Sequence, residues 1–221
     1  MNYHILNLRH SISALSIIAI ATLTSCMGPH KVNRDATKPL KAVFINPHET
    51  GSYEHFKANP SYPKTSKVYK SSDLLDKTTP SNSKVIVNLK LQRAFLYNGN
   101  EIAMDYPVST GKTEYPTPSG KFRITEKIED KRSNLYGKIV DADGKVVKSN
   151  ADAREDEIPE GGEFIGAAMP HWMRLTGDGV GMHKGYVPRY PASHGCIRTP
   201  GAVVPIVFEK VRVGTSVTII E

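Results

Sequence analysis

The sequence predicts a mostly β protein, a single sandwich-like or barrel-like domain of mixed sheet with one or two short helices. Apolar and polar residues alternate from Val85 to Leu91, as in a half-buried strand, and residues 94–97 form a second apolar run. The turn-forming residues 98–100 (Asn-Gly-Asn) separate that run from a third apolar stretch at residues 101–108. This pattern predicts a strand, a tight turn and another strand.

The later elements follow from the same reasoning. Residues 122–127 predict a further strand. The highly charged residues 128–162 predict a solvent-facing insertion beside a cleft, with a hairpin that turns at Asp143-Gly144. Residues 201–211 predict a short helix with a proline near its first turn, and residues 213–220 predict the last strand.

The N-terminal region differs in composition from the rest of the 221-residue chain. A small and apolar run at residues 11–23 is too short to span a bilayer comfortably, so residues 1–25 are expected to be a signal peptide. A short buried helix and an uncleaved anchor are the alternatives. Residues 26–82 are polar and predict a flexible tether, which leaves residues 83–221 for the main domain.

The net charge is +7 and the isoelectric point is about 9.3. An anionic cell wall or phospholipid surface would attract such a chain, although a solvated basic surface without a partner explains the charge equally well. No basic run interleaved with aromatic residues occurs in the sequence, so we expect no nucleic-acid partner.

The most informative local feature is Cys196, which stands between Gly195 and Ile197, a short way after His183. A free cysteine is most often a small buried hydrophobe. Here, however, an imidazole is available to draw the thiol proton, giving thiolate and imidazolium, and a thiolate is a strong nucleophile. Gly195 removes side-chain bulk beside the sulfur, so backbone N–H groups at this position can form an oxyanion hole.

Zinc binding is a rival interpretation of the same residues. His183, His194 and Cys196 are possible ligands, with His171 close in sequence. Their spacing matches no common zinc pattern. We therefore expect no metal and no cofactor.

Several motifs resemble the L,D-transpeptidase catalytic domain, also called the YkuD domain. The signature is Ser-His-Gly-Cys-Ile-Arg at residues 193–198, preceded by His183. Residues 115–122, 169–177 and 214–219 also resemble segments of that family. The likeness covers roughly residues 83–221.

The resemblance implies an L,D-transpeptidase-like fold and a cysteine-dependent acyl transfer on peptidoglycan stem peptides. Cys196 would be the nucleophile, His183 the general base and acid, and Gly195 part of the oxyanion hole. The backbone carbonyl of Lys184 would orient His183. Such enzymes cleave the bond before a terminal D-Ala and pass the acyl group to a second stem, forming a 3–3 crosslink, or to a lysine of a wall-linked protein.

Five further residues are candidates for substrate binding. The guanidinium of Arg198 suits a substrate carboxylate, although a structural ion pair would explain it equally well. Ser193 and His194 are expected to shape the turn before the cysteine. Tyr186 and Trp172 are candidates to line the cleft, although aromatic side chains more often lie in a core.

The other cysteine in the chain, Cys26, lies near the N-terminus in a different sequence context. Residues 23–26 (Leu-Thr-Ser-Cys) resemble a bacterial lipobox, in which the cysteine, here Cys26, is diacylated and becomes the mature N-terminus. Buried acyl methylenes contribute about 0.8 kcal/mol each, so such chains anchor a protein to a membrane. By resemblance to the sorting rule of enteric bacteria, Met27 in place of aspartate implies the outer membrane and an exported protein that faces the periplasm.

Two alternatives remain open at the sequence level. With water as acceptor, the same site is an L,D-carboxypeptidase. A non-catalytic wall-binding lipoprotein would keep the fold without turnover.

Overall fold

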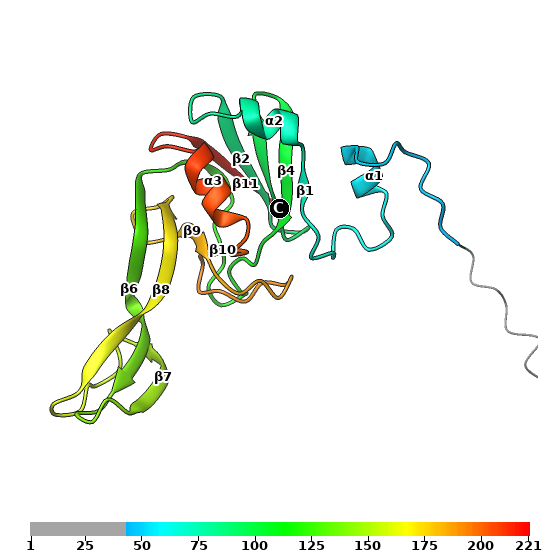
Figure 1. Ribbon diagram of the computed structural model, residues 1–221. Helices are drawn as coiled ribbons and strands as arrows, with labels where there is room; N and C mark the ends of the chain where they lie inside the picture. Colours follow the sequence, from blue (N-terminus) through cyan, green and yellow to red (C-terminus); the bar gives the residue numbers. More distant parts are fainter. Residues whose placement is uncertain (1–42) are drawn as a thin grey trace, which may run out of the picture. The chain divides into compact units, whose positions relative to one another are not determined.

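Two mixed β-sheets account for most of the regular structure in residues 43–221, the residues that the computed structural model describes (Figure 1). Across the first sheet the strands are β1 (Tyr69–Lys70), β4 (Glu101–Pro107), β3 (Arg93–Asn98), β2 (Ser83–Asn88), β11 (Ser216–Ile220) and β5 (Gly120–Arg123). β11 is parallel to β2, and the other neighbouring strands are antiparallel. The predicted mostly β, mixed-sheet fold class is confirmed.

The second sheet is built around two long strands. Its order is β10 (Ile197–Thr199), β9 (Gly181–Lys184), β8 (Glu163–Arg174), β6 (Glu126–Val140) and β7 (Val146–Asp152). β9 and β10 are parallel, whereas the other pairs are antiparallel. Figure 1 shows β6 and β8 side by side, continuing to the hairpin that carries β7.

The hydrophobic core lies between the first sheet, the helix α3 (Val204–Lys210) and the strands β8, β9 and β10. It includes Val85, Leu96, Met104, Tyr106, Met173, Met182, Ile197, Val204, Val207 and Val217. Burying one such aliphatic side chain contributes about 1.5–3 kcal/mol. The buried Met182 and Ile197 therefore tie β9 and β10 to the centre of the domain.

The predicted short helix with a proline in its first turn is α3, the one helix within residues 83–221. The predicted hairpin at Asp143-Gly144 is also present and joins β6 to β7. Asp141 Oδ1 accepts hydrogen bonds from the N–H groups of Asp143 and Lys145, and Gly144 has a φ of +77°. Both elements form where local turn chemistry indicated them.

Two predicted strands have different limits in the structure. The alternation to Leu91 extends past the end of β2 at Asn88, whose Oδ1 accepts the Leu91 N–H at 2.8 Å and closes a turn. The single strand predicted for residues 122–127 is two strands, β5 and β6, in different sheets. Ile124, which is buried between them, marks the point where the chain crosses from one sheet to the other.

The segment predicted as a flexible tether, residues 26–82, differs from that prediction from residue 44 onward. Residues 44–82 belong to the same compact unit as the sheets and contain α1 (Tyr53–Lys57), β1 and α2 (Ser72–Lys77). Residues 26–42, the predicted signal peptide and Cys26 lie outside the described residues. From residue 43 onward, no helix has the length and apolar character that crossing a bilayer requires.

A buried ion pair between Arg93 and Asp105 explains why this segment is ordered. The Arg93 guanidinium also donates hydrogen bonds of 3.1–3.2 Å to three backbone oxygens of the segment, those of Pro63, Thr65 and Lys67. The hydroxyls of Tyr53 and Tyr62 donate to Asp105 Oδ2 at 3.0 and 3.1 Å. A buried charge requires such partners, and here the partners come from residues 53–67.

Candidate active site

The sheet brings the cysteine and the histidine of the motif to one cavity. In the parallel pair of β9 and β10, His183 lies opposite Arg198, and Cys196 directly precedes β10. His183, Cys196 and Arg198 line the same cavity of about 500 Å³. Residues that are 13 positions apart in sequence, His183 and Cys196, therefore face one space.

His183 is held by the carbonyl that the sequence indicated. His183 is only 7% exposed, and its Nδ1 lies 2.7 Å from the backbone oxygen of Lys184. A carbonyl only accepts hydrogen bonds, so Nδ1 carries the proton of the neutral ring and Nε2 is left as a proton acceptor. Burial lowers the pKa of His183 to about 4, an effect that the Lys184 hydrogen bond opposes and Arg198 reinforces.

Cys196 is half-buried, and its Sγ lies 3.7 Å from the backbone oxygen of Gly179. Burial raises the pKa of its thiol, and the Gly181 backbone, Arg198 and Arg174 oppose that rise only in part. Burial thus disfavours the charged forms of both Cys196 and His183. The resting pair is neutral thiol and neutral imidazole, in contrast to the thiolate held by imidazolium that the sequence suggested.

The loop before Cys196 contains a glycine with positive φ and two backbone N–H groups that no protein acceptor in residues 43–221 takes. Gly195 has a φ of +104°, which an L side chain rarely adopts, so glycine is required there. The Ser193 hydroxyl donates to the backbone oxygen of Cys196. Within residues 43–221, the backbone N–H groups of Gly195 and Cys196 donate to no protein acceptor. They are available to an oxygen atom in the cavity.

The ring of His194, in the same loop, packs against two tyrosines. Its ring centroid lies 4.7 Å from that of Tyr115 and 4.6 Å from that of Tyr136. Tyr136 reaches this position because β6 bulges between Arg132 and Gly137. A Cβ on Gly137 would lie 2.2 Å from the backbone oxygen of Ile165, so the close approach beside the bulge requires glycine.

Sequence reasoning missed Tyr115 and Tyr136 as site residues. Tyr136 lies in the charged insertion, which was correctly expected to lie beside the cleft. For Tyr136, the only sequence signal is an aromatic residue followed by glycine in an otherwise charged segment. That signal is weak because it says nothing about which residue the ring contacts.

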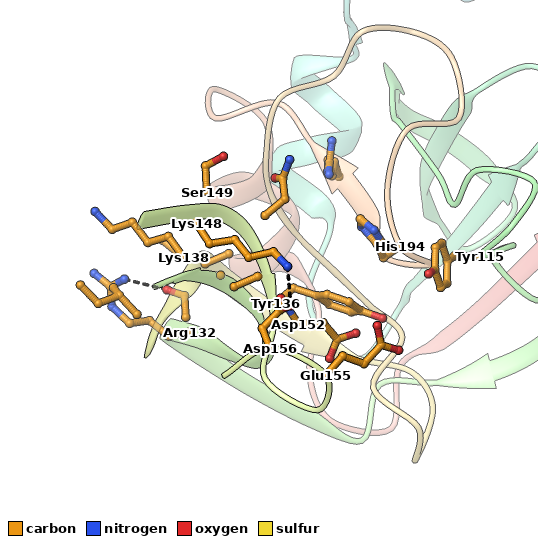
Figure 2. A pocket seen from close by; sticks show the side chains of 18 residues that line it. Tyr115, Arg132, Tyr136, Lys138, Lys148, Ser149, Asp152, Glu155, Asp156 and His194 are labelled. Carbon is orange, nitrogen blue, oxygen red and sulfur yellow. Dashed lines mark hydrogen bonds and ion pairs between the residues drawn. The ribbon is translucent and has the colours of Figure 1, made fainter. Parts of the chain in front are cut away.

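A second cavity, of about 580 Å³, adjoins the first and lies over β6, β7 and β8 (Figure 2). Tyr115, Tyr136, His194 and Arg198 line both cavities. The walls that belong to the second cavity alone carry charges of both signs, from Arg132, Lys138, Lys148, Asp152, Glu155 and Asp156. The two cavities therefore meet at His194 and the two tyrosines.

The remaining predicted binding residues separate into two groups. Arg198 lies in both cavities, and its guanidinium has no ion-pair partner in the part of the chain that the structure describes. Tyr186 is 79% exposed at the rim of the first cavity. Trp172 differs from its prediction, since it is only 1% exposed and packs 6.1 Å from the His183 ring between centroids. It supports the histidine and does not line the cleft.

Metal coordination has no geometric support in residues 43–221. No group of three His, Cys, Asp or Glu side chains converges there as a set of ligands. His171, considered as a zinc ligand, packs edge-on against Phe208 instead, with ring centroids 5.2 Å apart.

Cys196 and a buried, carbonyl-oriented His183 thus share one cavity of a two-sheet β domain. The sequence model of the L,D-transpeptidase catalytic domain (YkuD) matches residues 82–219. This chain belongs to that family. Its domain class is accordingly that of L,D-transpeptidases, which are acyltransferases.

A relative identified by its sequence agrees with the family. The chain is 30% identical over 141 residues to the Bacillus subtilis (strain 168) protein named "Putative L,D-transpeptidase YqjB", an overlap of 63% of this chain and 72% of the relative. Among solved structures, an L,D-transpeptidase from Mycobacterium smegmatis has 19% identity and a TM-score of 0.48, covering 63% of this chain and 59% of its own. The catalytic domain of an Enterococcus faecium L,D-transpeptidase has 27% identity and a TM-score of 0.44, covering 62% and 95%. The chain thus spans less than two thirds of the mycobacterial protein.

The buried His183 makes stability depend on pH. Its pKa is about 4 in the folded protein and about 6.5 when exposed, so the unfolded chain binds more protons between these values. Lowering the pH from 6.5 to 4 should therefore remove up to about 3 kcal/mol of stability through this residue. Urea unfolding across that range should show a steeper loss for the native protein than for His183→Gln. Parallel curves for the two proteins would contradict the assignment.

Proposed function

We propose that the protein is a cysteine-dependent L,D-transpeptidase that acts on peptidoglycan stem peptides through a thioester acyl-enzyme. The observation that carries the proposal is the shared cavity of Cys196 and His183, in which Nδ1 is occupied by the Lys184 carbonyl and Nε2 can accept a proton. Membership of the L,D-transpeptidase family supports the substrate class.

The first half-reaction forms the thioester. The Cys196 sulfur attacks the amide carbonyl carbon while His183 Nε2 takes the thiol proton, so the charged pair exists only during attack. The N–H groups of Gly195 and Cys196 stabilise the oxyanion of the tetrahedral intermediate. When this intermediate collapses, the C–N bond breaks and the imidazolium protonates the leaving amine, D-Ala in a tetrapeptide stem.

The second half-reaction transfers the acyl group. An acceptor amine attacks the thioester carbon, His183 takes the proton of that amine, and the C–S bond breaks. The proton then returns to sulfur, which regenerates the neutral thiol. A second stem as acceptor gives a 3–3 crosslink, and a lysine of a wall-linked protein gives attachment of that protein.

The two adjoining cavities favour transfer over hydrolysis as the main reaction. A transferase must hold a donor and an acceptor together, and cavities of about 500 and 580 Å³ meet beside His194. Hydrolysis by an L,D-carboxypeptidase needs only water in the second position. Crosslinked dimers indicate transfer, whereas trimmed stems alone indicate hydrolysis.

The central test is whether Cys196 is acylated by the substrate. Mixing the protein without residues 1–25 with muropeptide tetramers should give an acyl adduct on Cys196 by mass spectrometry, followed by crosslinked dimers. Cys196→Ala should give neither product, with an unchanged thermal transition as the control for folding. Persistent dimer formation by Cys196→Ala would refute the proposal, whereas trimmed stems without dimers would establish the carboxypeptidase.

Arg198 is proposed to bind a carboxylate of the stem. It lines both cavities and has no ion-pair partner among residues 43–221, so its charge is available to a ligand. Arg198→Lys keeps the charge but loses the bidentate geometry, and KM for the tetrapeptide should rise about tenfold at similar kcat. A lower melting temperature with unchanged KM would instead indicate a structural role.

We further propose export and a lipid anchor at Cys26, with the domain facing the periplasm, most simply from the outer membrane. The support is the lipobox-like sequence at residues 23–26 and the absence of aspartate at position 27. Mass spectrometry of detergent-extracted protein from the native cells should show a chain that begins at a diacylated Cys26. A Cys26→Ala variant should leave the membrane fraction, and retention of that variant in membranes would count against this anchor.

A further inference from the structure

We propose that Thr117 is a positioning residue for the oxyanion hole, acting through the peptide bond between Gly195 and Cys196. The proposal rests on the proposed function, because an oxyanion forms only if Cys196 attacks a carbonyl. It adds to the site a residue from the loop between β4 and β5, which is far from the cysteine motif in sequence.

The Thr117 hydroxyl has two hydrogen bonds whose directions are unambiguous. Its Oγ1 lies 2.7 Å from the Gly195 backbone oxygen, which can only accept, so Thr117 donates its single proton there. The Gly111 N–H donates to the same Oγ1 at 2.8 Å. Thr117 is 5% exposed, so this pair of bonds is shielded from water.

The bond to Gly195 determines where the Cys196 N–H points. The only cis peptide bond in the described residues is Tyr62-Pro63, so the peptide between Gly195 and Cys196 is trans. In a trans peptide the C=O and the next N–H point in opposite directions. Because Thr117 holds the Gly195 oxygen inside the protein, the Cys196 N–H is directed the other way, and no protein acceptor within residues 43–221 takes it.

Glycine makes such a restraint necessary. Gly195 lacks a Cβ and has a φ of +104°, a region in which the adjoining peptide plane meets little steric resistance to rotation. A rotated peptide would present the carbonyl oxygen to the developing oxyanion instead of the N–H. The hydrogen bond from Thr117 disfavours that rotation.

The loop that carries Thr117 is itself joined to the cysteine loop. The Thr110 oxygen accepts the N–H groups of Ala192 and Ser193 at 2.9 and 3.0 Å, and the Lys112 N–H donates to the Ser193 oxygen at 3.0 Å. A Cβ on Gly111 would lie 2.1 Å from the Tyr115 backbone oxygen, so the loop closes tightly beside Thr117. These contacts fix the position of the Thr117 loop relative to the cysteine loop.

Two reactions of the same sulfur distinguish positioning from general support. Acylation of Cys196 by a tetrapeptide stem passes through an oxyanion, whereas alkylation by iodoacetamide is a direct displacement that forms none. A residue that only keeps the loop folded, or that only tunes the thiol, affects both rates. A residue that orients the oxyanion donor affects acylation alone.

The experiment measures both rates in Thr117→Val, which keeps the shape but removes the hydroxyl, and in Thr117→Ser, which keeps the hydroxyl. We expect Thr117→Val to slow single-turnover acylation and kcat about 10- to 100-fold, with KM and the alkylation rate within about twofold of the native values. Thr117→Ser should restore acylation to within about threefold. Thr199→Val is the matched control, since Thr199 is fully buried and its hydroxyl has no partner in the described residues.

Other outcomes are equally decisive. Unchanged acylation in Thr117→Val, or equal losses of acylation and alkylation, would overturn the proposal. If Thr117→Val shows no cooperative thermal transition, the same two rates in the smaller Thr117→Ala decide the question. Failure of the native protein to form any Cys196 acyl adduct would overturn the proposed function instead, before Thr117 is tested.

Discussion

The parallel pairing of β9 with β10 is the contact on which the rest of the site depends. Only three residue pairs form this ladder, and such a short pairing is weak by itself. It persists because Met182 and Ile197 are buried in the core and because Ser109 exchanges two backbone hydrogen bonds with Arg198, of 2.8 and 3.0 Å. The approach of cysteine to histidine is therefore a product of the whole domain's packing.

The same packing controls the chemistry of the pair. Burial makes the charged forms of His183 and Cys196 costly, so a reactive thiolate is not maintained in the absence of substrate. In the proposed reaction, proton transfer from Cys196 to His183 therefore accompanies attack, when hydrogen-bond donors in the cysteine loop meet the oxygen that becomes negative. For the proposed reaction, the backbone geometry of this loop then matters as much as the two side chains.

Two parts of the chain outside the motif contact the region of the site. The long strand β6 carries Tyr136 to the His194 ring, and β6, β7 and β8 line the second cavity (Figure 2). The segment before residue 83 is tied to the first sheet through the buried Arg93, and its Lys64 oxygen accepts a hydrogen bond from Arg189 in the loop between β9 and β10 at 2.9 Å. Polar contacts thus connect the N-terminal segment to the site.

By itself the sequence determined the mostly β class and the hairpin at Asp143-Gly144, and the family resemblance indicated the Lys184 carbonyl as the partner of His183. Each of these depends on residues close together in the chain, where propensity and turn chemistry act. Only the tertiary structure decided that residues 44–82 fold onto the sheet, that Trp172 lies beneath the histidine, and that Thr117 contacts Gly195. These contacts depend on how the chain folds back on itself. Burial shifts the pKa values of His183 and Cys196 toward their neutral forms, and that burial exists only once the sheets have packed.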